Sequence, residues 1–345
     1  MIKANYKKYI LDFKNPSGTS RGVLRTKETW FIVLEENGKT GIGETGLFRG
    51  LSVDDVSNYE EKLIWTCSNI SKGLEWLLNE LLEFPSIQFG LEQAYLSLKS
   101  KDQFQLFPSE FTKGKETIAI NGLIWMGEKE FMKKQIKEKL KTGFSCIKMK
   151  IGAIDFEAEI ELLKSIRNEF SSKEIELRVD ANGAFIPKNA LDKLQRLSEL
   201  DIHSIEQPIK QGLVNEMAEL CAKTPLPIAL DEELIGVFSS EAKKKLLTAI
   251  KPQYIILKPS LIGGFVGSLE WINLAKENKC DWWITSALES NVGLNAIAQF
   301  THTLKSSLPQ GLGTGGLFTN NFESPLEVKK GTLQYNPDKY WKFNL

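Results

Sequence analysis

The stretch Cys146–Ile151, with the sequence CIKMKI, decides how this chain folds. Side chains of a β-strand point alternately to its two faces, so Ile147 and Met149 share one face of this strand and Lys148 and Lys150 share the other. The apolar face must pack under covering helices. We therefore expect both lysines to point into the mouth of a barrel.

Four later apolar runs also end in a charged residue. Neighbouring runs lie about one strand and one helix apart, as in parallel strands that are joined by crossover helices. Because the active sites of parallel barrels lie at the carboxyl ends of the strands, we expect these side chains to meet there. The charged residues are Asp180 in LRVDAN (177–182), Glu206 in SIEQP (204–208), Asp231 in ALDEE (229–233) and Lys258 in ILKPS (256–260).

Short apolar runs alternate with helical patterns over residues 116–321, which predicts an α/β fold with a modified TIM barrel of the (β/α)7β type. Residues 1–115 are patterned as strands followed by helices and predict an N-terminal α+β capping domain. Within this domain, Asn37-Gly38 predicts a hairpin turn. We expect the tail, about residues 322–345, to return to this domain as a hairpin. The predicted barrel strands are Thr117–Ile124, Cys146–Ile151, Ile175–Asp180, Ser204–Glu206, Ile228–Asp231, Tyr254–Lys258, Trp282–Ser286 and Gly311–Gly313.

The composition is that of an ordinary globular protein. Of the 345 residues, 42% are hydrophobic and 26% are charged, and the formal net charge is zero. A neutral chain offers little attraction to nucleic acids or anionic membranes, so we expect neither as a partner. Four widely spaced cysteines and an N-terminus without the apolar core of a signal peptide predict reduced thiols and a cytoplasmic location. The sequence leaves the oligomeric state open.

Three carboxylates without a neighbouring histidine or thiol predict a site for one hard divalent cation. The expected ligands are Asp180, Glu206 and Asp231. The expected ion is Mg²⁺, with Mn²⁺ able to replace it, because oxygen donors suit both. The only histidines, His203 and His302, stand in patterns typical of structural residues, so acid–base chemistry falls to lysine or carboxylate.

Lys150 is the expected catalytic base. The positive charges of Lys148 and of the cation, together with burial, disfavour its protonated form. This combination indicates abstraction of a proton next to a carboxylate, with the cation stabilising the enediolate that results. Lys258, on the opposite wall, would act as an acid or as a fixed positive charge.

Together these residues resemble the enolase superfamily, and within it the muconate-lactonizing-enzyme subgroup. The resemblance covers nearly the whole chain, and the superfamily is a known example of a lysine base used with Mg²⁺. Three stretches, residues 177–182, 257–263 and 286–294, are similar to the subgroup members that dehydrate 2-succinyl-6-hydroxy-2,4-cyclohexadiene-1-carboxylate in menaquinone synthesis. This resemblance implies a small carboxylate as the substrate and a lyase activity.

The resemblance also implies roles for single residues. Lys150 would remove the proton alpha to the ring carboxylate and return it to the departing hydroxyl, while Lys258 would stabilise the enediolate. Arg178 and Ser286 would contact the substrate, although a supporting structural hydrogen bond explains each equally well. Asn182 would contact a substrate oxygen or orient a metal ligand, and a supporting role behind the ligands is the better explanation.

A polar loop, Asn15–Gly22, follows the first predicted strand, Lys3–Phe13. The resemblance implies that the loop at residues 17–27, with Arg21 and Arg25, closes over the site. An ordinary surface loop is the alternative.

Two other functions remain open. A racemase of N-succinyl amino acids, or a dipeptide epimerase, would use the same two lysines on opposite faces of its substrate. A barrel that binds a metabolite without catalysis is a third possibility, because a carboxylate at a strand end often only caps a helix. The shared order, spacing and side-chain parity of the charged residues favour an enzyme over this third function.

Overall fold

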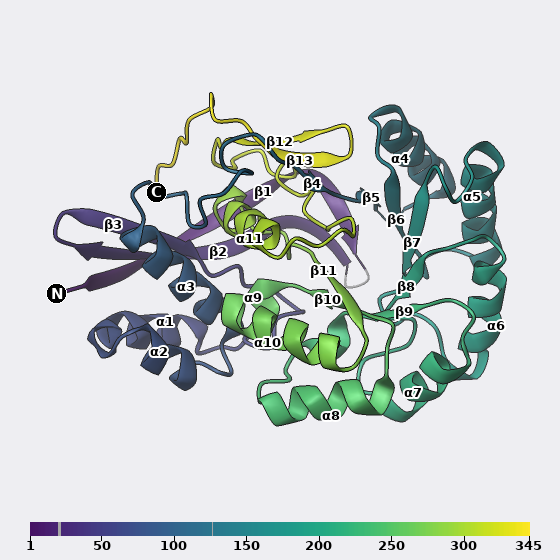
Figure 1. Cartoon of the computed structure of the whole chain (residues 1–345), viewed down its shortest axis with the longest axis horizontal. Coiled ribbons are helices and arrows are strands. Elements are labelled where there is room, and N and C mark those ends of the chain that lie inside the picture. The colour runs from purple at the N-terminus through teal and green to yellow at the C-terminus, as the bar shows by residue number, and fades with distance from the viewer. Residues whose placement is uncertain (20–21, 126) are drawn as a thin grey trace.

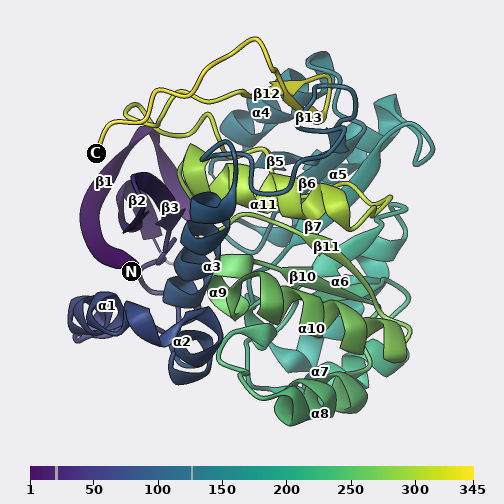
Figure 2. The same cartoon turned by 60° about the vertical axis from the view of Figure 1, so that its left-hand side comes forward.

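The structure is a computed structural model that describes residues 1–19, 22–125 and 127–345. Figure 1 shows an N-terminal sheet with its helices on one side and a larger ring of parallel strands and outer helices on the other. Figure 2 shows α3 (Pro85–Lys99) between the N-terminal sheet and the ring. This helix contacts β3 on one side and α9 and α10 on the other. Within the described residues, no helix is both long and apolar enough to cross a lipid bilayer.

The N-terminal sheet is antiparallel, and its helices follow it in the chain. Asn37 and Gly38 both have positive φ, 51° and 76°, so the predicted hairpin is confirmed. The predicted loop Asn15–Gly22 is wrong over residues 15–19, because the first strand continues to Thr19, while residues 20–21 lie outside the described part of the chain. The pairing of the first two strands shifts register between Asp12 and Ser17, and such a shift lets polar residues extend a ribbon. The elements are β1 (Lys3–Thr19), β2 (Gly22–Glu36), β3 (Lys39–Glu44), α1 (Tyr59–Ser68), η1 (Ile70–Lys72), α2 (Leu74–Glu80) and α3.

Seven parallel strands form the second sheet, in the order β11-β10-β9-β8-β7-β6-β5. Ile147 and Met149 are fully buried in the main core, as the alternation predicted. The predicted α/β class with parallel strands and crossover helices is confirmed. The strands are β5 (Gly122–Ile124), β6 (Cys146–Lys150), β7 (Glu176–Asp180), β8 (Ser204–Glu206), β9 (Ile228–Leu230), β10 (Tyr254–Leu257) and β11 (Asp281–Ile284). The helices are α4 (Lys129–Lys141), α5 (Phe156–Glu169), α6 (Pro187–Ser198), α7 (Val214–Lys223), η2 (Glu232–Leu234), α8 (Ser240–Ile250), α9 (Pro259–Ile262), α10 (Gly264–Glu277) and α11 (Asn291–Thr303).

Residues 310–311 bridge the end of the edge strand β11 to the segment that leads into the other edge strand, β5. Gln310 N donates to Ala119 O at 2.8 Å on one side, and Gly311 N donates to Ile284 O at 2.8 Å on the other. An eighth strand was predicted at Gly311–Gly313. The structure has only two bridging residues there, Gln310, just before this range, and Gly311, its first residue. The glycines of this range supply no side chains with which a longer strand could pack.

The C-terminal tail forms the expected hairpin, but not against the N-terminal sheet. Strands β12 (Leu326–Lys329) and β13 (Thr332–Tyr335) pair with each other, and β13 pairs with β4 (Ile118–Ala119). The residues after the hairpin reach the N-terminal sheet, where Phe343 packs against Phe31.

Candidate active site

The strand register brings the predicted residues into rows across the barrel. Lys150 pairs with Asp180, and Asp180 pairs with Glu206 on the next strand. Lys148 pairs with Arg178 in the row below. Paired residues of adjacent parallel strands point to the same face, so the lysines and carboxylates project together from the inner side.

Lys148 lies between two of the carboxylates. Its Nζ donates to Glu206 Oε2 at 2.5 Å and to Asp180 Oδ2 at 3.2 Å. Burial lowers the pKa of Lys148, but the charges of these two carboxylates outweigh it and raise the pKa overall. Burial and repulsion from Asp180 raise the pKa of Glu206. The pKa of Asp180 is lowered, because Lys150 and Lys148 together outweigh the effect of its burial.

Lys150 is held from one side by Asn182. Its Nζ donates to Asn182 Oδ1 at 2.7 Å and to Asp180 Oδ2 at 3.2 Å. Asn182 has a φ of 43°, donates through its backbone N–H to Asp180 Oδ1, and donates through Nδ2 to Glu232 Oε1. The amide of Asn182 therefore joins the predicted base to a fourth acidic side chain.

Lys258 and Asp231 form another ion pair of the site, at the ends of β10 and β9. Burial lowers the pKa of Lys258, but Asp231 and then Glu206 raise it by more. Three strands separate β10 from β6, which carries the other two lysines, so Lys258 stands apart from Lys150 across the site.

The donor set fits a hard cation. All three predicted ligands are carboxylates that are at most 2% exposed. Glu206 Oε1 is buried and, within the described residues, has no hydrogen-bond partner. Across residues 1–19, 22–125 and 127–345, no three His, Cys, Asp or Glu side chains stand in a metal-binding arrangement. Each of the three predicted ligands contacts a lysine ammonium group. Binding of a cation would therefore require the lysine side chains to shift.

One cavity of about 360 Å³ opens over these residues. Phe48 and Leu51, from the loop after β3, line it together with Ser286–Leu288 of the loop after β11. The predicted residues that line it are Lys148, Lys150, Asp180, Asn182, Glu206, Lys258 and Ser286. Asp231 is not among the lining residues, but it forms an ion pair with Lys258, which is one of them.

Other predicted residues lie elsewhere. Arg178 is not a lining residue: its guanidinium donates to Glu176 Oε1 and Pro309 O and stacks over Trp283, beneath the cavity. Arg25 lies in β2, is exposed and does not line the cavity, and Arg21 lies outside the described residues.

Sequence reasoning missed Glu232, which lines the cavity and is only 5% exposed. Alternation after Asp231 gave no signal for it, because the chain turns there into η2 rather than continuing as a strand. Phe48 and Leu51 were missed because no periodic pattern marks the loop that carries them.

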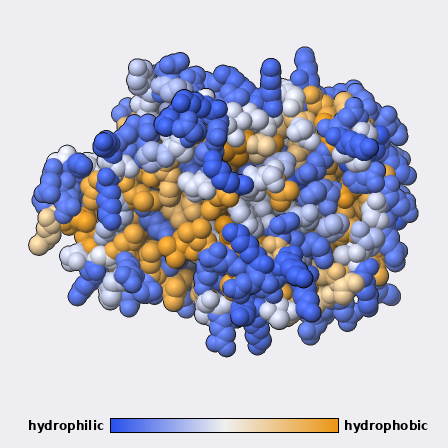
Figure 3. Space-filling model, viewed as in Figure 1, coloured by the Kyte–Doolittle hydropathy of each residue, from blue (hydrophilic) through white to orange (hydrophobic). Residues whose placement is uncertain are grey.

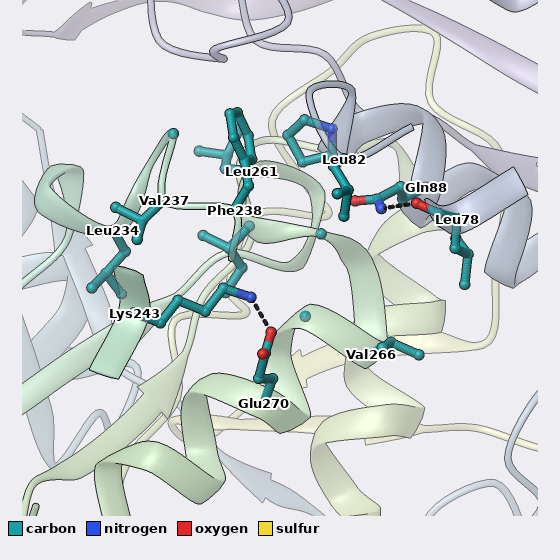
Figure 4. Close-up of a pocket in the computed structure, with 15 residues that line it drawn as sticks. Leu78, Leu82, Gln88, Leu234, Val237, Phe238, Lys243, Leu261, Val266 and Glu270 are labelled. Carbon is teal, nitrogen blue, oxygen red and sulfur yellow. Dashed lines mark hydrogen bonds and ion pairs between the residues drawn. The ribbon is translucent and has the colours of Figure 1, made fainter. Parts of the chain in front are cut away.

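A second, smaller cavity of about 80 Å³ lies between the N-terminal helices and α8 and α10. Figure 4 shows Lys243 and Glu270 facing each other on one wall and Gln88 bonded to Leu78 O on another. Hydrophobic residues gather in Figure 3 on the side where the N-terminal helices meet α9 and α10. None of the predicted catalytic or metal-binding residues lines this cavity.

Comparisons with known proteins agree with this geometry. The family model described as "Enolase C-terminal domain-like" matches residues 131–339. An o-succinylbenzoate synthase of Desulfotalea psychrophila (strain LSv54 / DSM 12343) is 47% identical to this chain, in an alignment that covers 96% of this chain and 98% of the relative. The crystal structure of MenC from Desulfotalea psychrophila LSv54 has a TM-score of 0.86 at 44% identity, over 96% of this chain and 99% of that chain.

The epimerases are more distant relatives. The L-Ala-D/L-Glu epimerase of Bacillus subtilis (strain 168) is 26% identical to this chain, in an alignment that covers 95% of this chain and 89% of the relative. The resemblance found in the motifs is confirmed, and the identity is far higher to the synthase. This chain belongs to the enolase superfamily and, within it, to the o-succinylbenzoate synthase family of carbon–oxygen lyases.

Proposed function

We propose that this protein dehydrates 2-succinyl-6-hydroxy-2,4-cyclohexadiene-1-carboxylate to 2-succinylbenzoate, with Mg²⁺ as cofactor, in menaquinone biosynthesis. The observation that carries the proposal is one cavity that holds Lys150 and Lys258 on strands far apart in the sheet, with buried carboxylates between them. The 47% identity to an o-succinylbenzoate synthase over nearly the whole chain supports the same reaction. The four free cysteines fit a cytoplasmic location.

Asp180, Glu206 and Asp231 would hold the cation. When bound, Mg²⁺ would stabilise negative charge on the substrate carboxylate as it develops, and Mn²⁺ would serve in its place. Glu206 Oε1, which is buried and has no hydrogen-bond partner in the part of the chain that the structure describes, fits this role, because an isolated buried carboxylate oxygen is costly.

Lys150 would act first as a base and then as an acid. As a neutral amine it takes the proton from the ring carbon that bears the carboxylate, and the C–H electrons move toward this carboxylate to give an enediolate. The C–O bond to the hydroxyl then breaks, and Lys150 returns the proton to this group, so that water leaves and the ring becomes aromatic. Asn182 Oδ1, 2.7 Å from Lys150 Nζ, would keep the amine aimed through both steps.

Lys258 and Lys148 would remain protonated. Both have raised pKa values caused by their carboxylate partners, so each supplies a fixed positive charge. Such fixed charges stabilise a developing anion without any rearrangement at the moment of reaction.

The test is the ultraviolet absorbance of the cyclohexadiene substrate with the purified protein. We expect rapid aromatisation with Mg²⁺, its loss with EDTA, and its loss in Lys150→Ala. Folded, Mg²⁺-bound protein that leaves the substrate unchanged would contradict the proposal.

Racemisation or epimerisation is the second candidate. It is favoured by the same two separated lysines and by the full-length match to an epimerase. Solvent deuterium entering N-succinyl amino acids or dipeptides, without aromatisation of the cyclohexadiene, would establish it. Absence of both reactions, with tight binding of a carboxylate, would indicate the non-catalytic barrel.

A further inference from the structure

A glutamate of the N-terminal sheet caps a helix of the barrel. Glu44, at the end of β3, is fully buried. Its carboxylate accepts from Ser290 N at 2.9 Å, Ser290 Oγ at 2.6 Å and Gly293 N at 2.9 Å, at the start of α11. The first N–H groups of a helix have no partner within the helix, so a carboxylate placed there stabilises it. Glu44 thus fastens the N-terminal sheet to the segment that follows the cavity wall.

The preceding residue, Glu289, fastens the cavity wall itself. It is also fully buried, and its two oxygens accept from Ser260 Oγ at 2.6 Å and Ala287 N at 2.7 Å. Ser260 comes two residues after Lys258, and Ala287 lines the cavity. One side chain therefore connects the strand end that carries Lys258 to the loop after the neighbouring strand, β11.

This wall has a strained backbone. Leu288, which also lines the cavity, has a φ of 62°, in the left-handed region that a leucine seldom adopts. Such a conformation persists only where surrounding contacts fix it, and these places are often functional sites. The residues around Leu288 are held by hydrogen bonds: Ala287 N donates to Glu289 Oε2, and Ser290 donates to Glu44.

A buried lysine balances the charge of the two glutamates. Lys27 of β2 is 7% exposed, and among the described residues its Nζ has no hydrogen-bond partner. Burial lowers its pKa, while Glu44 and Glu289 oppose this effect. The N-terminal sheet thus contributes both an anchor, Glu44, and a compensating charge, Lys27, to the same wall.

We propose that Glu289 and Glu44 are positioning residues for the reaction at Lys258. Glu289 sets the Ser286–Leu288 wall against the strand end that carries Lys258, and Glu44 ties this wall to the N-terminal sheet. The proposal rests on the proposed function, because positioning is defined by the reaction that it serves. The placement of the wall can also be measured without any substrate.

A matched control lies at the same interface. Glu92 of α3 is 4% exposed and accepts from Phe265 N and from Val266 N, the latter at 2.9 Å, at the start of α10. It joins the N-terminal helices to a barrel helix, but its partners lie on α10, whereas the partner of Glu44, Ser290, follows the Ser286–Leu288 wall directly in the chain. Methionine at any of these three positions removes both acceptors at similar volume.

The experiment compares Glu289→Met, Glu44→Met, Glu92→Met and the conservative Glu289→Gln in the full-length protein. We expect kcat to fall at least tenfold in Glu289→Met and Glu44→Met, but less than threefold in Glu92→Met. The melting temperature should fall by a similar amount in all three variants. Glu289→Gln should keep most of kcat, because the Ser260 hydroxyl can accept from an amide. An equal fall of kcat in Glu92→Met, or no fall in Glu289→Met, would overturn the proposal.

Hydrogen–deuterium exchange supplies the readout that needs no substrate. The amide of Ala287 should exchange at least tenfold faster in Glu289→Met, and those of Phe265 and Val266 only in Glu92→Met. Unchanged exchange at Ala287 would overturn the placement. If the wild-type protein fails to aromatise the substrate while Ala287 still exchanges faster in Glu289→Met, that result would support the role of Glu289 in placing the wall and would reject only the proposed function.

Discussion

Lys148 Nζ lies 2.5 Å from Glu206 Oε2, although their strands, β6 and β8, are separated by β7. The same ammonium group contacts Asp180 on β7, so the side chain of Lys148 links three adjacent strands. A buried carboxylate is costly unless an opposite charge accompanies it. Lys148 therefore contributes to the charge balance of the site as well as to its chemistry.

Replacing Lys148 by Met should destabilise the protein strongly in the absence of Mg²⁺. Two buried carboxylates would lose a partner, and breaking such a pair from one side costs about 3–5 kcal/mol of the free energy of unfolding. Urea unfolding in EDTA measures this. Lys305→Met is the control, because its ion pair with Glu116 is exposed and should contribute less than about 1 kcal/mol. A Lys148→Met loss no larger than that of the control would contradict the argument.

Mg²⁺ should raise the melting temperature of the wild type but not of Glu206→Gln. A ligand that binds only the native state stabilises it by about 2.7 kcal/mol at a hundredfold excess over its Kd. Differential scanning calorimetry with Mg²⁺ and with EDTA tests this. Glu323→Gln, a change at an exposed glutamate, should retain the full shift. A shift of equal size in Glu206→Gln would remove Glu206 from the ligand set.

The rows of charges were predictable from the sequence because strand alternation is local. It placed Lys148, Lys150 and Asp180 on one face without knowledge of the rest of the fold. Alternation does not show how deep a residue lies below the mouth of the barrel, however. Arg178 was expected to contact the substrate, but it lies two residues before Asp180 on the same strand and stacks over Trp283. The roles of Glu44 and Glu289 depend on contacts between segments far apart in the chain, about which a local pattern carries no information.

Stability should depend on the titration of Asp54. This carboxyl accepts from Ser86 N and Oγ through one oxygen, and its other oxygen is buried without a partner among the described residues. Burial raises the pKa of Asp54 from 3.8 to about 6. Between these pH values the unfolded chain loses its proton before the folded protein does, so this residue reduces stability as the pH rises.

Asp54→Asn should abolish that contribution. We expect the stability of the wild type relative to Asp54→Asn to fall as the pH rises from below 4 to above 6, measured by urea unfolding at several pH values. A difference between the two proteins that does not change with pH would show that Asp54 titrates alike in the folded and unfolded states.

Arg178→Met should affect stability rather than substrate affinity. The guanidinium is buried, pairs with Glu176 and stacks over Trp283 at 4.2 Å, but it does not line the cavity. We expect a loss of about 3 kcal/mol in unfolding free energy with KM changed less than about threefold. Thermal unfolding and steady-state kinetics together test this. A large rise in KM at unchanged stability would return Arg178 to the substrate site.

Lys258→Arg separates dehydration from racemisation. Arginine keeps the positive charge and can pair with Asp231, but it does not give up a proton at neutral pH. If Lys258 serves only as a fixed charge, Lys258→Arg should aromatise the cyclohexadiene within about tenfold of the wild-type rate, whereas Lys258→Ala should lose about 10²–10³-fold. Racemisation of an N-succinyl amino acid needs proton transfer from both faces, so it should vanish in both variants. Racemisation that survives in Lys258→Arg would show that Lys258 is not the second acid, and aromatisation as slow in Lys258→Arg as in Lys258→Ala would show that its charge alone does not account for its role.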